Sequence, residues 1–203
     1  DVGELDAFLR QLVEQRLVEV QAGGRGGDGA RFFRAAGWTE DQIARWRADY
    51  GGVGKGVTPM PRSYHRLSEG DAVRIGDDDW TVVIGSGHSP EHVCLWRRSD
   101  DVFLAGDQIL PRISSNVSVW PTEPMGDPLG DWMASLDRLR ELLPEGALVL
   151  PAHGEPFQGV HARLEALKRG HETALKRLDR KLRQPSRVID GFPAVFGRAI
   201  GDG

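Results

Sequence analysis

Apolar residues recur every three or four positions in the first part of the chain, which is the spacing of an amphipathic helix. This spacing predicts a helix over residues 4–20, then a glycine-rich loop over 23–29 and a second helix over 30–36. A third helix is expected to start at Thr39, because Gln42 stands three residues later and completes a capping box.

From residue 63 the apolar period shortens to that of β-strands. Helical spacing returns after Pro128, which suits the first turn of a helix over 129–143, and again over about 160–183. Strands that follow one another with no helix between them form an antiparallel meander. The predicted strands are 64–67, 72–75, 80–84, 93–96, 102–105 and 147–150, with a hairpin turn over 76–78.

Three of the predicted strands stop abruptly at a His or an Asp among glycines and prolines. His88 follows the first of these strands, Asp107 the second and His153 the third. Glycines at a sheet's rim let an ion or ligand approach the backbone, and imidazole and carboxylate groups are metal ligands. The pattern therefore favours one site assembled from several strand ends. The ordinary alternatives are histidines held by backbone groups and a turn aspartate.

Composition narrows the class of protein. The 203 residues are 39% hydrophobic and 28% charged, which is ordinary globular material, and the net charge of −4 gives no general attraction to nucleic acid or membranes. No apolar run approaches the length that crosses a bilayer. The single cysteine, Cys94, lies within a predicted apolar strand, so we expect a buried, inert thiol and a cytoplasmic protein. The chain opens on Asp1 without a Met, so an earlier leader stays open.

The last long helix is basic. Residues 161–183 carry eight Lys or Arg and three Asp or Glu. Such a helix is commonly a docking element with a solvated face, and the alternative is a patch that attracts a polyanion such as RNA.

Three stretches, taken in order, carry a family resemblance: Gly85-Ser86-Gly87-His88-Ser89-Pro90-Glu91-His92, Leu104-Ala105-Gly106-Asp107 and Leu150-Pro151-Ala152-His153-Gly154. Over roughly residues 60–160 the chain resembles the second half of a metallo-β-lactamase-fold hydrolase. The resemblance implies a fold of the α+β/α/β class, the metallo-β-lactamase-type αβ/βα four-layer sandwich, with a metal site at one edge of its two sheets. It also implies that His88 ligates one zinc ion, that His153 ligates a second, and that Asp107 bridges the two as the catalytic carboxylate.

An aspartate at the bridging position makes the chain similar to the glyoxalase II and nuclease branches rather than to lactamases with a cysteine ligand. Because a carboxylate is a harder ligand than a thiolate, manganese or iron becomes admissible beside zinc. His92 either lines the pocket or, as a commoner alternative, sits behind the ligands or in the core. Residues Ser114, Asn116 and Trp120 follow Asp107 as candidate pocket walls, with simple loop packing as the alternative.

The family's H-x-H-x-D-H motif is absent, since no histidine precedes His65. Either the chain belongs to a longer hydrolase, so that the N-terminal part of the fold is missing, or it is a variant that lost its metals and kept the fold for binding. On this basis residues 1–160 are expected to form the metallo-β-lactamase-fold domain without its first ligand motif. Residues 161–203 are expected to form a truncated helical extension.

The functional prediction is a metal-dependent hydrolase in which a binuclear zinc site activates water against an ester, thioester or related bond. The first alternative is a metal-dependent endoribonuclease, and the second is a catalytically inactive binding domain. The expected partner is a small-molecule substrate, with nucleic acid less favoured, no membrane, and a homodimer left open.

Overall fold

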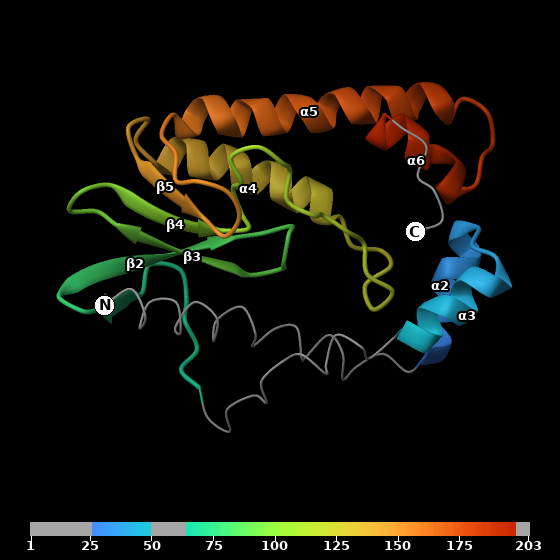
Figure 1. Cartoon of the computed structure of the whole chain (residues 1–203), viewed down its shortest axis with the longest axis horizontal. Coiled ribbons are helices and arrows are strands. Elements are labelled where there is room, and N and C mark those ends of the chain that lie inside the picture. Colours follow the sequence, from blue (N-terminus) through green and yellow to red (C-terminus); the bar gives the residue numbers. More distant parts are fainter. Residues whose placement is uncertain (1–25, 50–63, 198–203) are drawn as a thin grey trace. The chain divides into compact units, whose positions relative to one another are not determined.

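The computed structural model describes residues 26–49 and 64–197, which belong to two compact units (Figure 1). Residues 64–119 and 125–168 lie in the first unit, and residues 26–49, 120–124 and 169–197 lie in the second. The helix predicted over 4–20 lies outside the described residues. Within the described ranges, no helix has both the length and the apolar character needed to span a membrane.

The first unit is built on one five-stranded sheet. Its first four strands form the predicted antiparallel meander, and the pairing of Ile75 with Asp78 leaves a two-residue hairpin turn between them. The last strand runs parallel to its neighbour, because the chain crosses over between them through a helix. In spatial order the strands are β1 (Ala72–Ile75), β2 (Asp78–Gly85), β3 (His92–Arg97), β4 (Val102–Gly106) and β5 (Leu148–Pro151).

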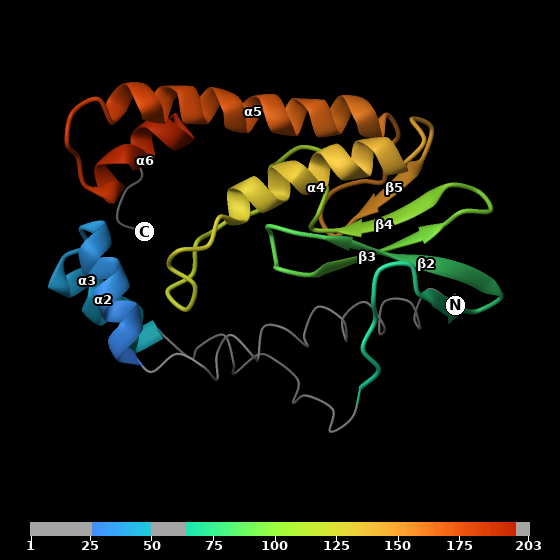
Figure 2. The ribbon, with the colours of Figure 1, turned by 180° about the vertical axis from the view of Figure 1, so that it is seen from behind.

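Two helices cover one face of this sheet: α4 (Pro128–Leu142) and the first part of α5 (Val160–Lys181) (Figures 1 and 2). As predicted, Pro128 opens α4, where its missing N–H costs nothing, and the Asp127 side chain accepts a hydrogen bond of 3.0 Å from the Gly130 amide. The apolar core between sheet and helices includes Val83, Cys94, Phe103, Trp132, Leu136, Leu139 and Leu164. Cys94 is thus buried, as expected.

The opposite face of the sheet is also apolar. A second core cluster contains Trp80, Val82, Leu95, Val102 and Leu104, none of them more than 7% exposed. Strands with two apolar faces are typical of a sheet buried between layers.

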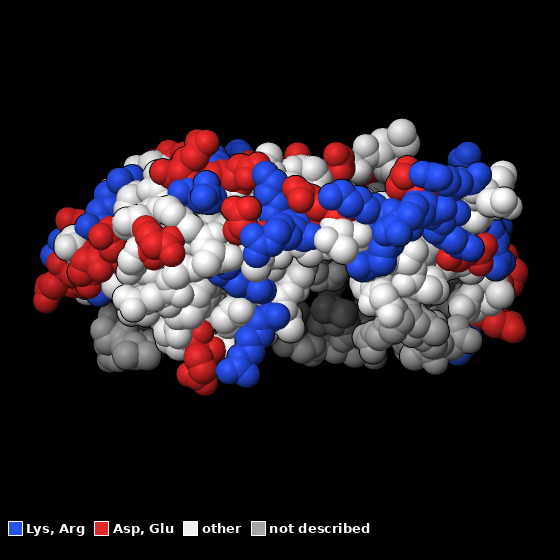
Figure 3. All heavy atoms as spheres, turned by 90° about the horizontal axis from the view of Figure 1, so that it is seen from above, with Lys and Arg blue, Asp and Glu red and all other residues white. Residues whose placement is uncertain are grey.

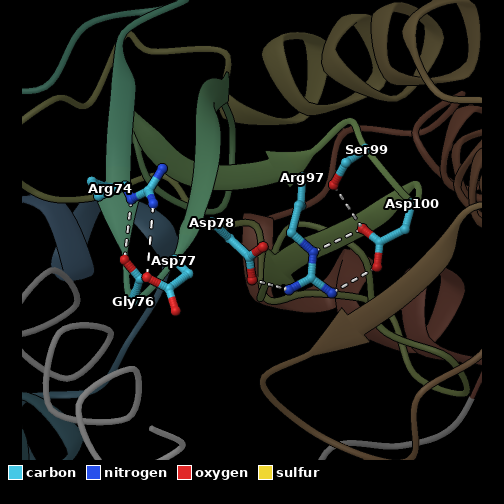
Figure 4. Close-up of polar contacts among 7 residues, drawn as sticks. All are labelled: Arg74, Gly76, Asp77, Asp78, Arg97, Ser99 and Asp100. Carbon is cyan, nitrogen blue, oxygen red and sulfur yellow. Dashed lines mark hydrogen bonds and ion pairs between the residues drawn. The ribbon is translucent and has the colours of Figure 1, made fainter.

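The turn between β1 and β2 and the turn between β3 and β4 carry charged residues that contact one another or the backbone (Figure 4). Arg97 donates to both carboxylate oxygens of Asp100 at 2.7 Å and to Asp78 at 2.6 Å. Arg74 donates to the Gly76 carbonyl at 3.1 Å. These partly exposed contacts link the turns and contribute little to stability.

In the second unit the structure describes α2 (Gly26–Ala36), α3 (Glu40–Asp49) and α6 (Val188–Phe196). The capping box at Thr39 is confirmed: its amide donates to the Gln42 side chain at 2.9 Å, and the Gln42 amide donates back to the Thr39 hydroxyl at 3.3 Å. The loop predicted over 23–29 is wrong from Gly26 onward, because that stretch is helical. A Cβ at Gly29 would lie 2.4 Å from the Trp46 ring, so packing against α3 favours a glycine inside this helix.

The strand predicted over 64–67 is also wrong. These residues have no ladder partner in the part of the chain that the structure describes, and Tyr64 is 69% exposed. Leu67 nevertheless packs against the second core cluster. The apolar alternation therefore records burial of one side chain rather than a hydrogen-bonded strand.

Candidate metal centre

Three strands end at the same edge of the sheet. Because β2 and β4 are each antiparallel to β3, they run in the same direction, and β5 is parallel to β4. The carboxyl ends of these three strands therefore meet at one edge. The Ala152 amide donates to the Gly106 carbonyl at 2.9 Å, which places the residues after β4 and β5 side by side.

The structure brings the three predicted site residues together at this edge. The His88 Nε2 atom lies 3.4 Å from Oδ2 of Asp107, and the His153 Nε2 atom lies 3.5 Å from Oδ1 of the same carboxylate. Asp107 therefore stands between two imidazoles, with one ring facing each of its oxygens. The side chains of His88 and Asp107 are about one quarter exposed, whereas that of His153 is 69% exposed.

A backbone carbonyl orients the first imidazole. The His88 Nδ1 atom lies 2.8 Å from the Asn116 carbonyl oxygen. Because a carbonyl can only accept, Nδ1 carries the proton, and the neutral ring turns the lone pair of Nε2 toward Asp107. Two electron-rich groups facing each other require a cation between them, either a proton or a metal ion.

The electrostatics of the His88–Asp107 pair agree with this geometry. Hydrogen bonding to Asp107 raises the pKa of His88, against the opposing effect of burial. Hydrogen bonding to His88 lowers the pKa of Asp107. The pair thus favours a protonated ring beside an ionised carboxylate, and a bound metal ion would replace that proton.

The donor set is suited to zinc. The buried Oδ1 atom of Asp107 has no hydrogen-bond partner within the described ranges, so it is available to a cation. Two imidazole nitrogens and a two-oxygen carboxylate are ligands that zinc accepts, and a second residue that holds the first ligand's other nitrogen is typical of such sites. Over residues 26–49 and 64–197, however, no group of three or more His, Cys, Asp or Glu encloses a single ion. The three side chains offer fewer ligands than one closed site needs.

His92 lies beside the candidate ligand His88. Its ring packs edge-on against that of His88 with centroids 5.6 Å apart, and a Cβ at Gly106 would lie 2.5 Å from its Nε2 atom. Burial, followed by the nearby His88, lowers the pKa of His92 to about 4. His92 is therefore a neutral packing residue near neutral pH.

The segment after Asp107 contributes through its backbone. Asn116 uses its carbonyl on His88, and the Ser114 hydroxyl donates to the Ser115 carbonyl at 3.1 Å. Trp120 is 50% exposed. The predicted side-chain pocket walls thus stay a prediction.

Sequence reasoning missed three polar residues around the candidate ligands. The Ser115 hydroxyl donates to the Asp107 carbonyl, and Gln108 and Ser135 are buried polar residues beside the loop that carries His88. No local pattern marks Gln108 and Ser135, because their contacts join segments that lie far apart in the sequence.

Comparisons with known proteins agree on one family. A family model described as the metallo-beta-lactamase superfamily matches residues 21–153. The chain is 32% identical over 134 residues to the probable metallo-hydrolase YqjP of Bacillus subtilis, covering 62% of this chain and 41% of that protein. It is 30% identical over 133 residues to the acyl-coenzyme A thioesterase MBLAC2 of Gallus gallus, covering 62% and 44%.

A solved structure extends the likeness to the fold. The crystal structure of a beta-lactamase domain protein from Burkholderia ambifaria superposes with a TM-score of 0.72 at 37% identity, covering 87% of this chain and 50% of that one. The chain therefore spans about half the length, or somewhat less, of the relatives that it matches. The predicted fold is confirmed, and the chain belongs to the metallo-β-lactamase superfamily of hydrolases.

Proposed function

We propose that this chain contributes His88, Asp107 and His153 to a binuclear zinc centre that hydrolyses an ester or thioester bond. The observation that carries the proposal is the Asp107 carboxylate, which stands between two imidazoles with one ring nitrogen 3.4 to 3.5 Å from each oxygen. A carboxylate with both oxygens directed at nitrogen ligands can span two ions. His88 would hold one ion and His153 the other. Manganese or iron is admissible at the same ligands.

The chain's own groups would prepare the reaction. The Asn116 carbonyl keeps the proton of His88 on Nδ1, so that Nε2 remains a ligand. The Ser115 hydroxyl, through the Asp107 carbonyl, holds the backbone of the bridging residue. Zinc bound there would supply an activated water near neutral pH and would polarise the substrate carbonyl.

A thioester is the substrate class best supported. One relative is named as an acyl-coenzyme A thioesterase, and that property belongs to the relative.

The test uses the protein expressed from its complete gene. We expect about two equivalents of zinc by elemental analysis, and hydrolysis of an acyl-coenzyme A substrate that a chelator abolishes. His88→Ala should lose about one equivalent and at least roughly 100-fold in kcat/KM, because a ligand of the activated water's ion is removed.

The exposed His65 provides the control, and His65→Ala should keep both the zinc and the activity. A folded protein that takes up no transition metal, or a His88→Ala variant with full zinc content, would contradict the proposal.

A further inference from the structure

A polar side chain is fully buried directly after the bridging carboxylate. Gln108 is 0% exposed, and its Nε2 atom donates to the Ser86 carbonyl and to the Ser135 hydroxyl, both at 3.1 Å. A Cβ at Gly85 would lie 2.4 Å from the Gln108 side chain, so the amide packs directly on the end of β2. Gln108 follows Asp107 directly, and its side chain therefore links the backbone at Asp107 to the loop that leads to His88.

Ser135 on α4 closes this network. The Ser86 amide donates to its hydroxyl at 3.3 Å, so Ser86 is held through both its N–H and its C=O. Ser135 is 6% exposed and lies within the helix that packs under the sheet. Two side chains thus fix the backbone two residues before His88, and one of them is the immediate neighbour of Asp107.

The network has a cost that packing alone would not require. The Oε1 atom of Gln108 is buried and has no hydrogen-bond partner among the described residues, which is an unfavourable state for an amide oxygen. A methionine would fill similar space without that unpaired oxygen. What glutamine supplies instead is a directed link between two strand ends.

We propose that Gln108 and Ser135 are positioning residues that set the separation of His88 and Asp107 and so set the affinity of the metal centre. This inference rests on the proposed function. A purely structural role would lower stability and leave the ligands' geometry unchanged. A positioning role predicts that the geometry of the candidate ligands changes while the stability of the protein is affected less.

The experiment compares Gln108→Met, Ser135→Ala and the double variant in the protein expressed from its complete gene. Leu139→Ala is the matched control, because Leu139 is 0% exposed on the same helix and belongs to the apolar core. The first readout is the 15N NMR signals of the His88 imidazole in metal-free protein. The second is zinc affinity by competition with a chelator, and the third is the thermal unfolding midpoint.

We expect Gln108→Met and Ser135→Ala to shift or broaden the His88 signals and to weaken zinc binding by about 10- to 100-fold, which is typical when a residue supporting a ligand is lost. Their Tm should fall by less than that of Leu139→Ala. Leu139→Ala should lower Tm while leaving the His88 signals as in the wild type. The double variant should lose less affinity than the two single losses combined, because both act through one network.

The proposal is overturned if both network variants keep wild-type His88 signals and zinc affinity, or if Leu139→Ala disturbs the His88 signals as much as they do. Failure of the proposed function has a different signature. If the wild type binds no zinc but the metal-free His88 signals respond to the network variants alone, the positioning role stands and the metal-dependent hydrolysis does not.

Discussion

A buried histidine beside the candidate ligands should make this protein sensitive to acid. Burial lowers the pKa of His92 from 6.5 to about 4. A group whose pKa is depressed by folding stabilises the fold above its unfolded pKa, and that contribution is lost as pH falls through the folded value. The metal-free protein should therefore lose up to roughly 3 kcal/mol of unfolding free energy through His92 between about pH 6.5 and 4.

Urea unfolding of metal-free protein across that pH range measures the effect. His92→Gln should show a flatter dependence of unfolding free energy on pH, because glutamine gains no proton. His65→Gln, at an exposed position, should retain the wild-type dependence. Parallel curves for the wild type and His92→Gln would show that the ring is not kept neutral by burial.

At this scale the sequence predicted which candidate ligands lie together, but it did not predict the residues that support them. His88, Asp107 and His153 stand at strand ends marked by glycines, which is a local signal. The contact between Gln108 and Ser135 joins residues 27 positions apart, and it depends on the side of α4 that faces the sheet. Neither residue carries a local sign of its partner.

Among the elements, α4 acts as the support for the loop that carries His88. Gly87 has φ of +100°, and a Cβ there would lie 2.2 Å from the Trp132 Cβ and 2.5 Å from the Pro128 carbonyl oxygen. Arg138, further along α4, donates to the Ile84 carbonyl and, at 3.0 Å, to Glu69. Helix α4 therefore contacts the chain from the end of β2 to the loop that carries His88. A glycine is needed at position 87, because any side chain there would clash with the helix.

This contact gives a test at the scale of the element. Gly87→Ala should cost about 3 kcal/mol, because it adds a clash with α4 to the strain of a positive φ. Gly70→Ala separates the two effects, since Gly70 has φ of +83° and nothing within 4 Å of its Cβ position. That variant should cost about 1 kcal/mol. Equal losses in urea unfolding would mean that α4 does not press on Gly87.

The sequence pattern did not predict the direction of the last strand, β5. The pattern over 147–150 predicts a strand but not its partner, and the helix between β4 and β5 is what requires the parallel pairing. At 64–67 the sequence predicted a strand that does not form. The alternation there is strand-like, but these residues have no strand to bond with among the described residues. Alternation reports which side chains are buried, whereas strand formation also needs a ladder partner.

At the scale of the molecule, the sheet has apolar side chains on both faces, but the candidate site has too few ligands for one closed metal shell. The first observation is what a sandwich fold requires, and the match covers only 41 to 50% of the length of these relatives. The predicted boundary between residues 160 and 161 stays a prediction, because α5 runs without a break from Val160 to Lys181.

The basic character of α5 leads to a last prediction. Part of its positive charge serves internal contacts: Arg163 donates to the Leu110 and Ile113 carbonyls, Lys168 pairs with Asp137, and Arg177 donates to the Ala194 and Val195 carbonyls. Acidic side chains also lie among the more numerous basic ones on the face seen in Figure 3. Short single-stranded RNA should therefore bind weakly, with a log–log salt slope no steeper than about −2. Fluorescence anisotropy, measured at salt concentrations from about 50 to 200 mM, gives that slope.

The charge reversals Lys176→Glu and Lys181→Glu, at exposed positions, should leave thioester hydrolysis unchanged. Tight, steeply salt-dependent binding that these reversals abolish would instead favour the endoribonuclease, because only a helix face committed to phosphates would lose affinity in that way.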